Sequence, residues 1–163
     1  MKIAFKEEQK FTQWWLWLIL LGMGCMAVYG MYKQFFTSEK FGDKPLPDLG
    51  LLIFSLVIFG LIALIGFIKL KTEIDQNEIR MDFFPFIKKR IKWDDIENIE
   101  IVHYGFVGGW GIRLGTAYGT VYNTSGSVGL AIKLQDGSKF LIGTQKESEL
   151  QKIVPKVNER KSY

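Results

Sequence analysis

LGLLIFSLVIFGLIALIGFI, residues Leu49–Ile68, decides the fold class of this 163-residue chain. The run contains no Asp, Glu, Lys or Arg, and it is bounded by Asp48 and Lys69. A helix rises about 1.5 Å per residue, so a helix of this length reaches about 30 Å, the thickness of the hydrocarbon core of a bilayer. The run therefore predicts a membrane span.

A second uncharged run, Phe11–Tyr32, precedes the first one. It has three tryptophans near its beginning and two tyrosines near its end, and aromatic rings at both ends suit the headgroup regions of a bilayer. We predict a transmembrane hairpin over residues 11–68, with spans at about 13–32 and 49–68. The alternative is a pair of buried core helices, but a chain this short can hardly surround two uncharged helices of that length.

A cleaved signal sequence is a competing interpretation of the first run. Lys2, Lys6 and Lys10 resemble the basic start of a signal, and Cys25 follows a small residue, as in a lipoprotein cleavage site. However, Gly22 stands where such sites require Leu, and the run is longer than the roughly 7–15 residues of a signal core. We therefore expect an uncleaved span that contains Cys25.

Lysine and arginine near the span ends predict the orientation. Residues 1–10 hold three of them, residues 33–48 hold three, and residues 69–90 hold six. The positive-inside rule then places both termini in the cytoplasm. We expect a multi-pass protein of the cytoplasmic membrane, with residues 1–10 as a cytoplasmic tail and residues 69–163 as a cytoplasmic domain.

Residues 69–163 change to short alternating runs that are broken by turn residues. The runs predict about seven strands, over residues 71–75, 78–84, 88–93, 96–104, 121–124, 130–134 and 139–142. Thr144 and Glu147 fit a capping box, which predicts a C-terminal helix from about residue 145. The expected fold is α+β: a helical hairpin, then a small antiparallel β-barrel or sandwich closed by the C-terminal helix.

Four strings in this part resemble a known family. They are FFPFIKKRIKWDDIENI (Phe83–Ile99), GGWGIR (Gly108–Arg113), VYNTSGSVGLAI (Val121–Ile132) and LIGTQKESEL (Leu141–Leu150). With them, the stretch from Leu70 to Val154 resembles the bacterial pleckstrin-homology-like (PH-like) domains that follow one or two membrane spans. The resemblance implies a PH-like β domain in a membrane setting without established catalysis. The phosphoinositide-binding pattern of eukaryotic PH domains is not visible, so the resemblance implies no lipid specificity.

Side chains that carry chemistry are few. His103 is the only histidine and Cys25 the only cysteine, and this indicates neither a catalytic triad nor a zinc site. Asp94, Asp95 and Glu97 form a short acidic cluster that is more simply a turn before a strand. We expect no catalytic residues, no metal site and no cofactor, so the protein is not expected to be an enzyme.

The basic stripe of Lys88, Lys89, Arg90 and Lys92 is the first candidate site. A cation near an anionic leaflet contributes about 1 kcal/mol, so four of them could hold the domain against acidic headgroups. The alternative is a solvated edge strand, on which lysines oppose pairing with another chain.

Trp110 and Arg113 are the second candidate site, and they lie in a glycine-rich segment from Gly105 to Gly119. Glycine permits positive φ, so this segment could be a mobile aromatic loop that enters the membrane interface or binds a partner peptide, with Arg113 binding a carboxylate or a lipid phosphate. The alternative is a bulged corner of the sheet with Trp110 packed inward.

The net charge of +4 does not indicate nucleic-acid binding, because the charges of the β domain are interspersed. The expected function is that of a membrane-anchored, non-catalytic binding module, which presents its β domain to a protein or to anionic lipid headgroups. The alternative is a small accessory subunit whose hairpin stabilises a larger membrane complex.

Overall fold

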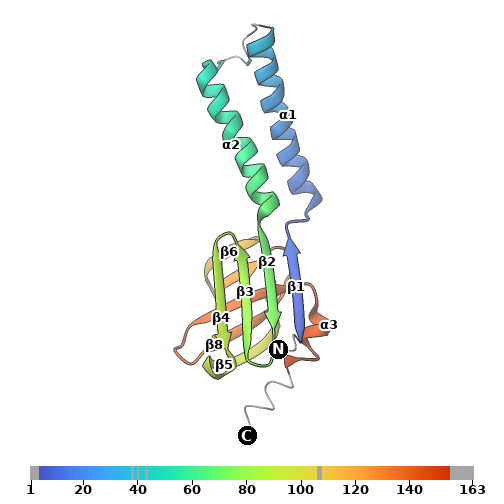
Figure 1. Cartoon of the computed structure of the whole chain (residues 1–163), viewed down its shortest axis with the longest axis vertical. Coiled ribbons are helices and arrows are strands. Elements are labelled where there is room, and N and C mark those ends of the chain that lie inside the picture. Colours follow the sequence, from blue (N-terminus) through green and yellow to red (C-terminus); the bar gives the residue numbers. More distant parts are fainter. Residues whose placement is uncertain (1–3, 38, 40, 43, 106–107, 155–163) are drawn as a thin grey trace. The chain divides into compact units, whose positions relative to one another are not determined.

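The computed structural model describes residues 4–37, 39, 41–42, 44–105 and 108–154. The chain forms two compact units, a hairpin unit of residues 12–67 and a β unit of residues 1–11 and 68–163. The hairpin unit is therefore an insertion between the first two strands of the β unit. In chain order, the elements are β1 (Phe5–Lys10), α1 (Trp14–Phe36), α2 (Asp48–Phe67), β2 (Lys69–Ile74), β3 (Glu78–Phe84), β4 (Ile87–Lys92), the 3₁₀ helix η1 (Trp93–Asp95), β5 (Ile96–His103), β6 (Gly111–Thr116), β7 (Gly119–Asn123), β8 (Val128–Leu134), β9 (Lys139–Thr144) and α3 (Glu147–Leu150) (Figure 1).

The two predicted apolar helices are present, and α1 continues four residues beyond its predicted end at residue 32. Small residues on one face of α1 are buried against α2. At Gly24, an added Cβ atom would lie 3.3 Å from Cδ1 of Ile62, so the helices approach closely there. By length and composition, both helices could cross a membrane.

The first sheet of the β unit has the strand order β1-β2-β3-β4, and all of its pairs are antiparallel. The second sheet has the order β5-β8-β9-β7-β6, and its β7–β9 pair is parallel. Of the expected antiparallel barrel or sandwich, the barrel is not formed, since the strands make two separate sheets, and the expectation of purely antiparallel pairing is wrong at the β7–β9 pair. Both sheets contribute to one hydrophobic core, with Leu70, Ile79 and Phe83 from the first and Leu130, Ile132 and Phe140 from the second.

Residues 5–10, which were expected to belong to a tail, form the strand β1, and β1 pairs with β2 along its whole length (Figure 1). Phe5, Glu7 and Gln9 alternate inward and are buried. The Gln9 Nε2 group donates to the carbonyl oxygen of Gly143 (2.8 Å), and Thr144 Oγ1 donates to Glu7 Oε2 (2.7 Å). The side chains of β1 thus form hydrogen bonds that connect the first sheet to β9 of the second sheet.

The C-terminal helix begins at Glu147, close to its predicted start near residue 145, but the predicted capping box does not form. Thr144 Oγ1 donates to Glu7 and accepts the backbone N–H of Lys146 (3.0 Å), so it does not cap Glu147. The helix α3 begins at Glu147 and has four residues. Its Leu150 is 1% exposed and joins the core, which is the contact that a covering helix was expected to make.

Candidate functional site

The outer face of the first sheet is almost entirely charged. Strand alternation places every second residue of β1 to β4 on this face. Its basic side chains are Lys6, Lys10, Lys69, Lys71, Arg80, Lys88, Arg90 and Lys92, and its acidic ones are Glu8, Glu73, Glu78 and Asp82. Basic groups therefore outnumber acidic groups two to one on this outer face.

The acidic groups of the outer face are paired across neighbouring strands, where opposite charges stabilise a sheet. Lys6 Nζ lies 2.8 Å from Glu73 Oε1, and Lys71 Nζ lies 3.3 Å from Glu8 Oε2. The hydrogen bond from Lys6 holds the pKa of the Glu73 carboxyl below its usual value. Arg80 forms ion pairs with three carboxylates at 3.1–3.7 Å. These pairs neutralise the acidic side chains of β1 to β3.

Positive charge without an acidic partner remains on β4, an edge strand of the sheet. Lys88 Nζ lies 3.3 Å from Asp82 Oδ2, but the Lys88 side chain is 74% exposed. Arg90 and Lys92 are exposed and form no ion pair with any residue that the structure describes. A shallow hollow of about 260 Å³ lies beside Arg90, and it is lined by five basic residues and by the carboxylates Glu73 and Asp82. This surface is suited to an anionic group.

Lys89 does not belong to this surface, although it was predicted as part of the basic stripe. It lies on the opposite face of β4 from Lys88 and Arg90, in agreement with the alternation of the strand. Its Nζ atom lies 4.5 Å from the ring centroid of Phe140 and 5.6 Å from that of Tyr122. Lys89 therefore packs its cation against aromatic rings of the second sheet.

Trp110 directly precedes β6, and Arg113 lies in it. The strand β6 is an edge strand of the second sheet. Trp110 is 36% exposed, so it is not packed fully inward, and its Nε1 donates to the carbonyl oxygen of Gly126 (3.4 Å). Arg113 Nη2 donates to the carbonyl oxygen of Trp110 (3.0 Å). The six candidate residues therefore do not form one site. Lys88, Arg90 and Lys92 share the outer face of the first sheet. Lys89 lies on the opposite face of β4, and Trp110 and Arg113 lie at β6 in the second sheet.

The groups with catalytic potential are dispersed. His103 Nε2 lies 3.2 Å from Glu147 Oε1, and the His103 side chain is 69% exposed. Asp94 and Asp95 belong to the 3₁₀ helix η1, which agrees with the turn interpretation of that acidic cluster. Within the described part of the chain, no three His, Cys, Asp or Glu residues gather as a metal site would require.

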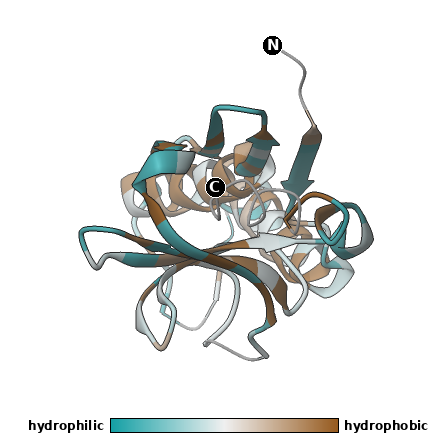
Figure 2. Cartoon of the chain, turned by 90° about the horizontal axis from the view of Figure 1, so that it is seen from below, coloured by the Kyte–Doolittle hydropathy of each residue, from teal (hydrophilic) through white to brown (hydrophobic). Residues whose placement is uncertain are grey.

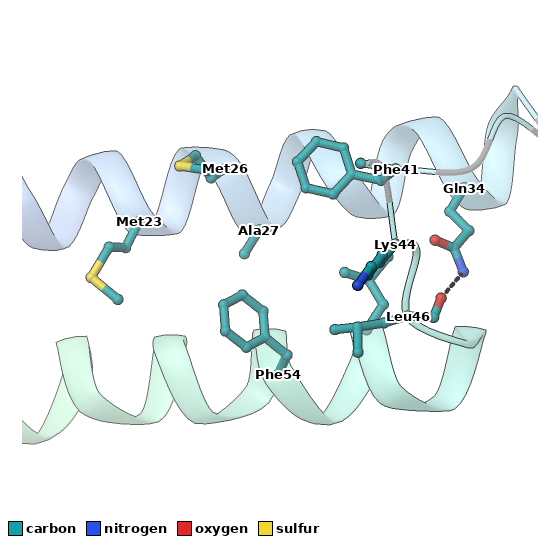
Figure 3. Close-up of a pocket in the computed structure, with 10 residues that line it drawn as sticks. Met23, Met26, Ala27, Gln34, Phe41, Lys44, Leu46 and Phe54 are labelled. Carbon is teal, nitrogen blue, oxygen red and sulfur yellow. Dashed lines mark hydrogen bonds between the residues drawn. The ribbon is translucent and has the colours of Figure 1, made fainter.

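The hairpin unit contains an apolar cavity of about 390 Å³ between α1, α2 and their connection (Figure 3). Met23, Met26 and Phe54 project toward it, and Lys44 and Gln34 lie at its loop end (Figure 3). Gln34 Nε2 donates to the carbonyl oxygen of Leu46 (3.0 Å) and so ties the connection to α1. This cavity therefore offers mainly apolar surface, with the Lys44 ammonium group at its loop end.

Sequence reasoning found the β4 part of the outer face and missed the rest. Lys71 and Arg80 were visible in alternating runs, but only the register of β2, β3 and β4 shows that they share one surface with Arg90. Lys6 and Lys10 were missed because β1 was not recognised as a strand. The outward alternation of Lys6, Glu8 and Lys10 was the available signal.

No known protein family matches the chain, and no curated protein matches it in sequence. The PH-like assignment therefore stays a prediction, and the function is inferred from the geometry.

Proposed function

We propose that the chain is a two-span protein of the cytoplasmic membrane, which presents a PH-like β unit at the bilayer surface as a non-catalytic binding module. The helices α1 and α2 have 23 and 20 residues, so each is long enough for the roughly 30 Å hydrocarbon core. Large apolar side chains such as Leu18 (61%) and Leu56 (75%) are exposed along them. Exposed apolar surface of this extent favours lipid as the surrounding medium and argues against core helices.

The pairing of β1 with β2 is the observation that carries this proposal. These strands flank the hairpin in sequence, and they pair from Phe5 with Ile74 to Lys10 with Lys69. Strands of one ladder lie on the same side of a bilayer, so the intervening chain crosses an even number of times. Two spans meet this condition, and the lysines and arginines of the β unit favour the cytoplasmic side.

Cysteine labelling in sealed membrane vesicles tests this topology. In a Cys25→Ser background, Lys6→Cys and Ser138→Cys are expected to react with a membrane-impermeant maleimide from the same side, because both positions belong to the β unit and are exposed. Leu46→Cys, in the connection between the helices, is expected to react only from the other side. Labelling of Lys6→Cys and Ser138→Cys from opposite sides, or extraction of the protein by alkaline carbonate, contradicts the proposal.

The outer face supplies the binding surface of the proposed module. Its unpaired cations, Arg90 and Lys92, lie with Lys88 along one edge strand, at intervals of about 6.6 Å. A row of exposed cations attracts anionic groups and loses this attraction as salt screens it. We propose acidic lipid headgroups as the ligand of this row.

Lysine footprinting of the full chain in nanodiscs tests the ligand. Lys88 and Lys92 are expected to be acetylated about twofold or more slowly in discs that contain phosphatidylglycerol than in neutral discs, because bound headgroups cover them. The matched control is Lys139, which is exposed on the second sheet. The protection should disappear at high salt. Equal rates in the two kinds of disc, or equal protection of Lys139, reject the lipid ligand.

A further inference from the structure

The turn between β3 and β4 exposes two aromatic rings. Phe84 is 40% exposed and Phe86 is 54% exposed. Among the described residues of the first sheet and its turns, no other large hydrophobic side chain is exposed. The rest of the outer face is charged. The backbone N–H of Phe86 donates to the carbonyl oxygen of Phe83 (2.8 Å), so the backbone of the turn that carries the rings is closed.

The register of the sheet places this turn at one particular end of the ladder. Lys10 pairs with Lys69, and Lys69 pairs with Phe84 on its other side. One residue separates Lys69 from the last residue of α2, and three residues separate Lys10 from the first residue of α1. The end of the sheet that carries the aromatic turn is therefore the end at which both strands continue into the apolar helices.

Lysines flank the two rings at this end of the sheet. Lys69 Nζ lies 5.9 Å from the ring centroid of Phe84, and Lys88 follows Phe86 two residues later on β4. Aromatic rings next to lysines are the composition that suits a bilayer interface, where rings enter the headgroup region and ammonium groups remain at phosphate depth. Neighbouring strands are about 4.8 Å apart, so a bilayer that begins at Phe67 is within reach of Phe84.

We propose that the β3–β4 turn is an interfacial anchor: Phe84 and Phe86 enter the surface of the same bilayer that the hairpin spans, and Lys69 and Lys88 contact its phosphates. This inference rests on the proposed membrane topology. The anchor would hold against the membrane the end of the first sheet at which Lys10, Lys69 and Phe84 are paired. This role differs from that of Arg90 and Lys92, which lie further along β4. It would limit rotation of the β unit about the two short connections.

Depth-dependent quenching in the full chain tests the anchor. In the Cys25→Ser background, the environment-sensitive fluorophore NBD is attached to Phe86→Cys, and the protein is reconstituted in phosphatidylcholine nanodiscs with and without a nitroxide-labelled lipid. The matched control is Gln76→Cys, an exposed position in the turn at the opposite end of the same strands. A second control is Val57→Cys, which is exposed on α2.

Quenching at Phe86→Cys is expected to be at least about threefold stronger than at Gln76→Cys, because the length of β3 separates the two turns by about 20 Å. Val57→Cys should be quenched strongly if α2 lies in the bilayer. Strong quenching at Val57→Cys with equal quenching at Phe86→Cys and Gln76→Cys overturns the anchor and leaves the topology intact. Absence of quenching at Val57→Cys overturns the topology and the anchor with it.

Discussion

A chain in which the linker Gly-Asn-Gly-Ser replaces residues 12–67 is expected to fold as a soluble protein without detergent. Lys10 and Lys69 are paired, and neighbouring strands lie about 4.8 Å apart, so the four linker residues together with Phe11 and Ile68 can join them. The described hydrophobic core of the β unit takes no residue from 12–67. Circular dichroism in urea should show one cooperative transition, because this unit has a complete core.

Removal of residues 1–11 from this linked chain is expected to abolish the fold. Burial of Phe5 contributes about 1.5–3 kcal/mol, and each hydrogen bond to the buried Glu7 carboxylate contributes about 1.5–3 kcal/mol. Two such bonds are present, from Thr144 Oγ1 and from the backbone N–H of Gln145 (2.8 Å). Together with the β1–β2 ladder, these contributions reach the whole stability of a typical domain, about 5–15 kcal/mol.

A matched control separates the buried face of β1 from its exposed face. In the linked chain, Lys6→Gln with Glu8→Gln changes two outward positions, and such surface changes usually cost less than about 0.5 kcal/mol each. This variant should unfold close to the urea midpoint of the parent. If residues 68–163 alone unfold at the same midpoint as the linked chain, β1 is dispensable and the insertion interpretation is wrong.

The elements that could be predicted from the sequence are those with a local signal. Exclusion of charge over 20 residues marks a long apolar helix, and both helices were predicted. Period-two alternation marked seven strands, and in the strand that became β4 the same alternation places Lys88, Arg90 and Lys92 on one face. The strand β6 was missed because its segment is rich in glycine, which weakens the alternation signal.

The features that escaped prediction depend on partners that are distant in the sequence. In β1, the inward positions hold Glu7 and Gln9, so the strand is hydrophilic almost throughout (Figure 2). These side chains are stable inside because hydrogen bonds with residues distant in the sequence, such as those with Thr144 and the Gly143 carbonyl, satisfy their polar atoms. The Thr144 hydroxyl accepts the backbone N–H of Lys146 in place of that of Glu147, so the predicted capping box does not form. Prediction of the whole outer face would have required the register of β1 to β4, and no local sequence pattern contains that information.

Gly119→Ala is expected to be among the most damaging single substitutions in the β unit. Gly119 begins β7 with φ +77°, and an added Cβ atom would lie 2.1 Å from the carbonyl oxygen of Lys139. Thr120 pairs with Phe140 in the parallel β7–β9 ladder, so this backbone is fixed on both sides. The positive φ costs about 1–2 kcal/mol and the overlap about 1–3 kcal/mol more, which gives a loss of about 3–5 kcal/mol.

Gly137→Ala is the matched control for this substitution. Gly137 has φ +84°, but an added Cβ atom there would meet nothing within 4 Å, so the loss should be only the conformational cost of about 1–2 kcal/mol. Urea unfolding of both variants in the linked chain measures the difference, which isolates the contact with Lys139. Equal losses would mean that β9 moves away from an added methyl group without cost, and the parallel pair would then not be a rigid part of the second sheet.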